Sequence, residues 1–291
     1  QAKLTGADSA AGDAFGGAVA LEEDVALVGA SGDDDRGTDS GSGFIFSRSG
    51  TSWSQQQKVT ATSGAAGDAL GSGVATWAGR ALFGSPGDDD RGTDSGAVHV
   101  FNRAGTSWTQ QAKLTASTGQ LLDHFGASVS MTGTTVAVGS AGDDDKLLGA
   151  GAAYIFALDG AAWSEKYKVF AADPGSQDGL GSAVSISGDT VLLGSPGDDD
   201  KGSDSGSAYF QQLCLGQGFT ERVKQTMPGG SANDVFGSAI ATDGEWALVS
   251  APQDDDLAND SGTAFMYRRT GSSTWTMSQK LMGPGGGVWD N

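Results

Sequence analysis

The residues best suited to chemistry are aspartates gathered in short acidic segments that recur along the chain. The segment GDDDRGTDSG occupies residues 32–41 and again 87–96, and GDDDKGSDSG occupies 197–206. Two further copies are less regular: GDDDKLLGAG at 142–151 has a glycine in place of the fourth aspartate, whereas QDDDLANDSG at 253–262 keeps all four. Glycine-rich turns that carry several carboxylates are typical sites for hard divalent cations.

Calcium is the cation that this chemistry favours. Neighbouring carboxylates repel one another unless a cation or backbone N–H groups compensate their charge, and Ca²⁺ accepts about six to eight oxygen ligands. In an extended segment the first and third aspartates point to the same side, so the fourth would complete the ligand set and the middle one would point outward. The predicted ligands are Asp33, Asp35, Asp39, Asp88, Asp90, Asp94, Asp143, Asp145, Asp198, Asp200, Asp204, Asp254, Asp256 and Asp260. The third segment, which lacks the fourth aspartate, is expected to be the weakest site.

A purely structural interpretation of the acidic segments stays open beside the calcium prediction. Aspartate next to glycine and serine is common in tight turns, because its side chain accepts hydrogen bonds from the following backbone N–H groups. The basic residue after each triplet would then neutralise part of the charge, at about 0–1 kcal/mol per exposed pair. That residue is Arg36, Arg91, Lys146 or Lys201.

The acidic segments belong to a repeat that extends through the chain. An aspartate two residues before an apolar–glycine pair recurs in steps of 55, 55, 55 and 56 residues, at Asp13, Asp68, Asp123, Asp178 and Asp234. The spacing predicts repeats at about 1–55, 56–110, 111–165, 166–221 and 222–278, with 279–291 as the start of a sixth repeat or a closing segment. We expect residues 1–291 to form a single domain.

Each repeat contains four short apolar runs separated by turn residues, which predicts a four-stranded antiparallel sheet. The second run, as at 25–28, is the most apolar and suits a strand buried on both faces. The third follows the acidic segment and carries aromatics, and the fourth begins at an aromatic residue such as Trp53. Four strands per repeat predict an all-β fold, a β-propeller with five complete repeats visible. A linear array of stacked sheets is the alternative.

These motifs resemble the FG-GAP repeat family, which includes the N-terminal propellers of integrin α chains. The family is named after two short motifs, Phe-Gly and Gly-Ala-Pro. Phe-Gly occurs at 15–16, 125–126 and 236–237, and Leu-Gly takes its place at 70–71 and 180–181. Sequences similar to Gly-Ala-Pro occur at 29–31, 84–86, 139–141, 194–196 and 250–252. The resemblance implies a β-propeller and extracellular ligand binding or adhesion rather than catalysis. The family's calcium loop joins its first two strands, where this chain has a hairpin as short as 187–189, so those ligands have no counterpart here.

Charge and composition exclude some classes of binding partner. With 17 Lys and Arg against 36 Asp and Glu, the formal net charge is −19, which disfavours nucleic acid and anionic membranes. No apolar run approaches the roughly 18 residues of a membrane span, so membrane insertion is not expected. Together with the family resemblance, these observations predict a secreted or cell-surface module without catalysis. Its expected role is adhesion or assembly, through a protein or glycan ligand at the cell surface or in the matrix.

Two alternatives compete with this prediction. A carbohydrate-binding propeller, either a lectin or the appended domain of a polysaccharide-degrading enzyme, is the first; Trp77 departs from the repeat pattern and would stack on a sugar if exposed. A glycoside hydrolase is disfavoured because the acids are copied in every repeat, whereas an active site needs unlike acids that converge once. Finally, unpaired strands at the two ends of the array would pair with neighbouring chains, so self-assembly is part of the prediction.

Overall fold

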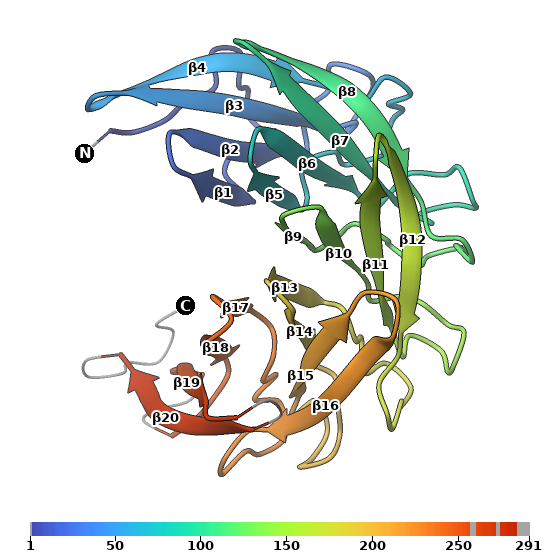
Figure 1. Ribbon diagram of the computed structural model, residues 1–291, viewed down its shortest axis with the longest axis vertical. Coiled ribbons are helices and arrows are strands. Elements are labelled where there is room, and N and C mark those ends of the chain that lie inside the picture. Colours follow the sequence, from blue (N-terminus) through green and yellow to red (C-terminus); the bar gives the residue numbers. More distant parts are fainter. Residues whose placement is uncertain (1, 257–259, 272–273, 284–291) are drawn as a thin grey trace. The chain divides into compact units, whose positions relative to one another are not determined.

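The computed structural model describes residues 2–256, 260–271 and 274–283 (Figure 1). Within these ranges all regular secondary-structure elements are β-strands, and the twenty strands form five four-stranded sheets. The all-β prediction is confirmed. Each sheet has the sequentially ordered, antiparallel strands of a β-propeller blade. No helix in the described residues is long and apolar enough to cross a membrane.

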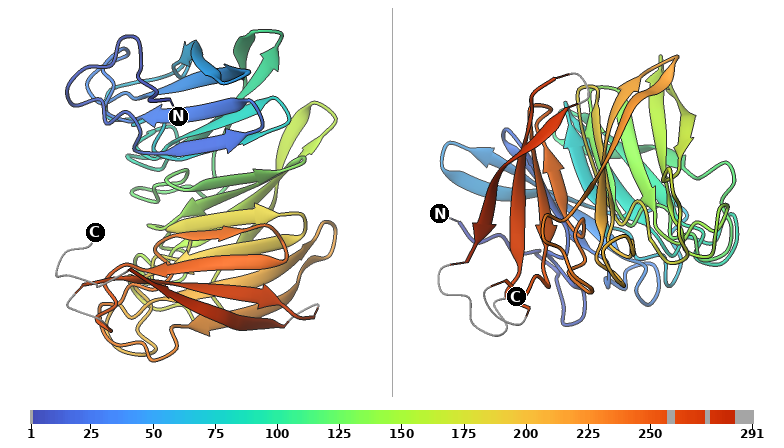
Figure 2. Two further views of the ribbon diagram at one scale, coloured as in Figure 1. Left: turned by 90° about the vertical axis from the view of Figure 1, so that its left-hand side faces the viewer. Right: turned by 90° about the horizontal axis from the view of Figure 1, so that it is seen from below.

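The five sheets follow the five repeats, and hairpins join neighbouring strands (Figures 1 and 2). The first sheet contains β1 (Val19–Glu22), β2 (Val25–Ala30), β3 (Ser42–Ser49) and β4 (Ser52–Val59). The second contains β5 (Val74–Trp77), β6 (Arg80–Ser85), β7 (Ala97–Ala104) and β8 (Ser107–Leu114). The third contains β9 (Val129–Thr132), β10 (Thr135–Ser140), β11 (Ala152–Asp159) and β12 (Ala162–Val169). The fourth contains β13 (Ala183–Ser187), β14 (Thr190–Ser195), β15 (Ser207–Cys214) and β16 (Gly218–Thr226). The fifth contains β17 (Ile240–Thr242), β18 (Trp246–Ala251), β19 (Thr263–Arg269) and β20 (Trp275–Met282).

The second strand of a sheet is the most deeply buried. Every residue of β2, β10 and β14 is buried, which agrees with the continuous apolar runs of their sequences. The fourth strands are more exposed, and β4 alternates exposed and half-buried side chains over its first four residues. The order of burial therefore follows the order expected from the apolar pattern of each repeat.

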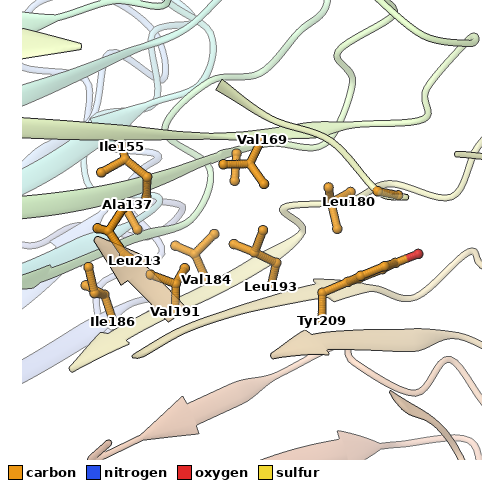
Figure 3. Packing of buried hydrophobic residues seen from close by; sticks show 12 residues of the cluster. Ala137, Ile155, Val169, Leu180, Val184, Ile186, Val191, Leu193, Tyr209 and Leu213 are labelled. Atoms are coloured by element: carbon orange, nitrogen blue, oxygen red, sulfur yellow. The ribbon is translucent and has the colours of Figure 1, made fainter. Parts of the chain in front are cut away.

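Contacts between Cα atoms divide the chain into two compact units. The first comprises Gln1–Thr134 with Leu158–Ser164, and the second comprises Thr135–Ala157 with Glu165–Asn291. Each unit has apolar clusters of its own. In the second unit, Ile155, Leu193 and Tyr209 belong to one cluster drawn from consecutive repeats (Figure 3). The single domain over 1–291 stays a prediction, and most of the expected sixth-repeat segment, 284–291, lies outside the described residues.

Glycines allow consecutive repeats to approach closely. A Cβ atom added to Gly84 in β6 would lie 1.8 Å from the carbonyl oxygen of Gly126, and one added to Gly194 in β14 would lie 2.0 Å from that of Gly237. Real Cβ atoms essentially never come within 3.0 Å of another heavy atom. In each pair the first glycine is the last but one residue of a second strand, and the other belongs to the next repeat's apolar–glycine pair. The two halves of the repeated motif therefore meet where one repeat packs on the next.

Candidate functional site: the acidic loops

Each acidic segment forms the loop between the second and third strands of a sheet. In the first loop Gly41 N–H donates to the carbonyl oxygen of Asp33 over 2.8 Å, and the side chain of Ser40 donates to the same oxygen over 3.0 Å. The middle aspartate, Asp34, accepts a hydrogen bond from the backbone N–H of Asp39 through Oδ1, at 2.8 Å. The loop is thus closed by its own side chains and backbone.

The fourth position of the loop requires a left-handed backbone. The φ angles there are 53° at Asp39, 55° at Asp94, 51° at Asp204 and 52° at Asp260, and Gly149 in the third loop has φ 61°. Aspartate tolerates this region better than most residues, and glycine adopts it freely. The N–H of Gly149 makes the equivalent bond to Oδ1 of Asp144, at 2.5 Å. At the fourth position the third loop therefore keeps the backbone conformation of the others although it lacks the carboxylate there.

The first and third aspartates of each loop converge on a lysine from the fourth strand of the same sheet. In the fourth sheet Lys224 Nζ lies 2.6 Å from Asp198 Oδ2 and 2.8 Å from Asp200 Oδ2. We call each such group of one lysine and two aspartates a clamp. The other clamps are Lys58 with Asp33 and Asp35, Lys113 with Asp88 and Asp90, Lys168 with Asp143 and Asp145, and Lys280 with Asp254 and Asp256. Their first aspartates are all buried.

An aromatic ring from the third strand lies beside the lysine in four clamps. The ring centroids of Phe44, Tyr154, Tyr209 and Phe265 lie 5.3, 5.1, 5.6 and 5.1 Å from the lysine Nζ atoms, within the range of cation–π attraction. The second sheet has His99 at this position, paired in register with Lys113. Burial, and next the charge of Lys113, lower the pKa of His99 to about 4. The imidazole is therefore neutral near pH 7 and, like the other rings, packs without adding charge.

The carboxylates keep the partly buried clamp lysines charged. Burial alone would lower the pKa of Lys224, but its hydrogen bonds to Asp198, Asp200 and Asp173 outweigh this effect and raise the pKa above its ordinary value. The pKa values of Lys58, Lys113 and Lys280 are raised for the same reason. A third carboxylate, Asp173, contacts Lys224 at 2.9 Å. A buried carboxylate with an ionised ammonium partner is stable only as long as that partner stays.

The structure separates the predicted calcium ligands into two groups. The first and third aspartates share one cation contact, as the extended-segment argument expects, and the lysine ammonium makes that contact. The fourth position contributes its backbone N–H to the middle aspartate. Among the described residues, no group of three or more His, Cys, Asp or Glu side chains is arranged to hold a metal. Calcium binding stays a prediction, and an ion at the first and third aspartates would have to displace the lysine.

The counter-ion is a residue that the sequence interpretation did not single out. The basic residues after the triplets, assigned to charge compensation above, are exposed at Arg36, Arg91, Lys146 and Lys201. The clamp lysines are distant in sequence from the triplets and lie on the fourth strands, which were predicted from the aromatic residue at their start. Their recurrence with the repeat, at 58, 113, 168, 224 and 280, was the signal that would have identified them.

The acidic loop also joins its repeat to the next one. Leu70 N–H donates to the carbonyl oxygen of Ser40 over 3.1 Å, and Phe236 N–H donates to that of Ser205 over 3.1 Å. Short parallel bridges accompany these bonds, such as Gly41 with Leu70 and Gly206 with Phe236. The loop therefore pairs with the apolar–glycine segment that opens the following repeat.

The aspartate that marks each repeat has a structural role in that opening segment. Asp178 Oδ2 accepts a hydrogen bond from Gly175 N–H at 2.6 Å, and Asp13, Asp68, Asp123 and Asp234 make the equivalent bond. All five aspartates are buried. Burial raises the pKa values of Asp68, Asp178 and Asp234. These buried side chains each cap a turn whose other residues are partly or fully exposed.

Trp77 lies in a different site, in the first unit. Its side chain is 41% exposed and lines a cavity of about 670 Å³ together with Glu23, Arg48 and Arg103. Glu22, also in the lining, accepts a hydrogen bond from Ala78 N–H. An exposed indole beside carboxylates and guanidinium groups is suited to stacking and hydrogen bonding with a polyol.

The repeats also match a known family model. The FG-GAP repeat model matches the chain at residues 1–46, 53–101, 108–156, 163–210 and 219–267. None of the curated proteins matches the chain.

Proposed function

Because the chain belongs to the FG-GAP repeat family, we propose that it is a non-catalytic interaction module that acts outside the cell and binds its ligand through the acidic loops. The supporting observation is that, in four of the clamps, the third aspartate of the loop keeps an exposed carboxylate. The third-aspartate side chains of Asp35, Asp90, Asp200 and Asp256 are 52%, 60%, 50% and 60% exposed. Repetition of one loop supports binding rather than turnover, because acid–base catalysis uses carboxyl groups in unlike environments.

The charge of the loops indicates the chemistry of the ligand. Each clamp sets one ammonium against two carboxylates, and the middle aspartate of every loop is exposed as well. A loop therefore carries excess negative charge after its internal pairing. Such a surface attracts cationic partners and speeds their encounter at low salt. We propose a protein ligand with a lysine- or arginine-rich surface.

Binding to a cationic ligand is expected to weaken when the fourth aspartates lose their charge. In the triple variant Asp39→Asn, Asp94→Asn and Asp204→Asn, asparagine still tolerates the left-handed backbone and the clamps stay intact. Biolayer interferometry with lysine- and arginine-rich peptides should show weaker binding to this variant and a shallower dependence on salt. Equal binding by the variant, or equal binding of acidic peptides, would contradict the proposed ligand class.

A glycan ligand is the second candidate, and the exposed Trp77 with its cavity supports it. A glycan array probed with the wild-type protein and with Trp77→Ala separates the two candidates. Loss of glycan signal in Trp77→Ala alone would assign binding to the Trp77 cavity. Glycan binding that depends on the three fourth-position aspartates would assign it to the acidic loops.

We also propose that the clamp lysines balance the first and third aspartates without calcium. Calorimetric titration of Ca²⁺ into chelator-stripped protein is then expected to give no binding heat and no rise in thermal stability. A ligand that binds only the folded state would raise that stability by mass action. Between three and five sites with a stabilising effect would instead support calcium in the loops and overturn this proposal.

A further inference from the structure

Arg103 lines the cavity beside Trp77 and has no carboxylate partner among the residues that the structure describes. Its Nε donates a hydrogen bond to the carbonyl oxygen of Gly105 at 2.9 Å, and its guanidinium carbon lies 5.9 Å from the ring centroid of Trp108. Neither contact supplies a negative charge. Arg103 is exposed, so an anion in the cavity can reach its guanidinium group.

The equivalent arginine of the fifth sheet shows which partner is missing. Nε of Arg269 donates to the carbonyl oxygen of the residue two positions later at 3.2 Å, as Nε of Arg103 does. Nη1 of Arg269 then contacts Oδ1 of Asp189, in the preceding repeat, at 3.4 Å and donates to Thr190 Oγ1 at 3.1 Å. The two arginines therefore share one backbone contact, but only Arg269 also has a carboxylate.

Two residues explain why Arg103 lacks this carboxylate. In the first repeat Asp24 takes the place of Asp189, and it accepts a hydrogen bond from Arg48 Nε at 2.8 Å. In the second repeat Gly79 takes the same place: its carbonyl oxygen accepts from Arg103 N–H as that of Asp24 accepts from Arg48 N–H. A Cβ added to Gly79 would lie 3.6 Å from Cβ of Arg103, an ordinary contact distance. The second sheet thus has no carboxylate where the first sheet places one beside its arginine.

Both walls of the cavity come from one compact unit. The cavity lies between the first and second repeats, where the β1–β2 hairpin and the β5–β6 hairpin are neighbours (Figure 1). Its volume of about 670 Å³ is within the range of small-ligand sites. The 41% exposed indole of Trp77 offers it a flat apolar face on which a sugar ring can stack.

We propose that this cavity binds an acidic sugar residue of a glycan, whose ring stacks on Trp77 and whose carboxylate pairs with Arg103. The proposal rests on the glycan ligand named above as the second candidate, and it adds the chemical class, a uronic acid. The ligand carboxylate takes the position beside Arg103 that Asp189 takes beside Arg269. Arginine suits this role because its planar guanidinium group binds a carboxylate through two parallel hydrogen bonds.

The acidic residues of the cavity limit how much charge the ligand carries. Of the described residues, three carboxylates line it. Ala78 N–H donates to the carboxylate of Glu22, and Arg48 contacts that of Asp24 at 2.7 Å. Glu23 is exposed at the turn of the hairpin and repels a highly charged ligand. The expected ligand is therefore a glycan with isolated uronic acid residues rather than a polyanion.

Calorimetric titration of the full chain tests the ligand class. The probes are an oligosaccharide with a single glucuronic acid residue and its methyl ester, which has the same ring but no charge. The ester is expected to bind about tenfold more weakly, because it loses a charge-assisted hydrogen bond, and Trp77→Ala should lose both. Equal binding of the two forms would overturn the acidic class and leave a glycan at Trp77. Binding of neither form would overturn the glycan candidate itself.

Two substitutions of Gly79 test the role of Arg103. Gly79→Asp supplies the missing carboxylate from within the protein, so it should weaken binding of the acid about tenfold. Gly79→Asn is the matched control, because asparagine has nearly the same size and, like aspartate, tolerates the φ angle of 75° at this position. It should bind the acid much more tightly than Gly79→Asp does. Equal binding by the two variants would overturn the proposal.

Arg103→Gln provides an independent test at the other partner. It should lose the preference for the acid over the ester but keep the binding of the ester, since Trp77 stays. Arg268→Gln is its control, because Arg268 is exposed in the second unit and contacts Glu245 at 3.0 Å; this variant should bind as the wild type does. All four variants at these arginine and glycine positions should unfold near the wild-type temperature. An Arg103→Gln protein that still prefers the acid would contradict the assignment.

Discussion

Lys224→Met is expected to destabilise the second unit by about 3 kcal/mol, because it leaves the buried carboxylate of Asp198 without its cationic partner. Lys224 contacts Asp198, Asp200 and Asp173, and the Asp198 side chain is 3% exposed. Methionine keeps much of the apolar stem but cannot donate a hydrogen bond. Chemical denaturation at pH 7, followed by tryptophan fluorescence, measures the loss.

Lys201→Met is the control for Lys224→Met, since it removes the same charge from an exposed position in the same loop. It should change stability by less than about 0.5 kcal/mol. The difference in unfolding free energy between the wild type and Lys224→Met should shrink as the pH falls. In the wild type, hydrogen bonds from Lys224 and Tyr209 outweigh burial and lower the pKa of Asp173, so the stability from that carboxylate is present above about pH 4 and is lost as the pH falls through the lowered pKa. Equal stability of the two variants at pH 7 would show that the clamp contributes little.

Gly84→Ala is expected to cost about 3 kcal/mol or more, because overpacking against backbone has no cheap relief. The added Cβ would lie 1.8 Å from the carbonyl oxygen of Gly126, so one repeat must move away from the next. Differential scanning fluorimetry and denaturant unfolding measure the loss. If the variant does not accumulate in soluble form, its soluble yield relative to the control gives the same comparison.

The control for Gly84→Ala is Gly105→Ala, in a hairpin where an added Cβ meets nothing within 4 Å. Gly105 has φ 65°, so alanine there carries only the cost of a left-handed backbone, about 1 kcal/mol. A similar loss in both variants would mean that close approach of the repeats is not what requires glycine at residue 84.

The sequence predicted the elements well because each of them depends on local pattern. Apolar runs of the right length marked the second strands, and aromatic residues such as Trp53 marked the start of the fourth. The alternation of a strand also placed the first and third aspartates of each loop on one side, where the structure brings Asp198 and Asp200 to a common partner. These features are set by residues close in sequence.

The partner of those aspartates was harder to predict because it comes from another strand. Lys224 lies beside Asp198 because the fourth strand pairs with the third, whereas the sequence alone pointed to the basic residue adjacent to the triplet.

The hydrogen bonds from each acidic loop to the following repeat have a consequence for folding. The turn that opens one repeat is completed by the loop of the repeat before it, as Ser205 completes the segment at Phe236. Part of the stabilisation therefore comes from contacts between neighbouring repeats, so that folding of one repeat favours folding of the next. Duplication of a whole repeat would create one more junction of the same type. The array can thus lengthen in evolution by complete units while every junction keeps its chemistry.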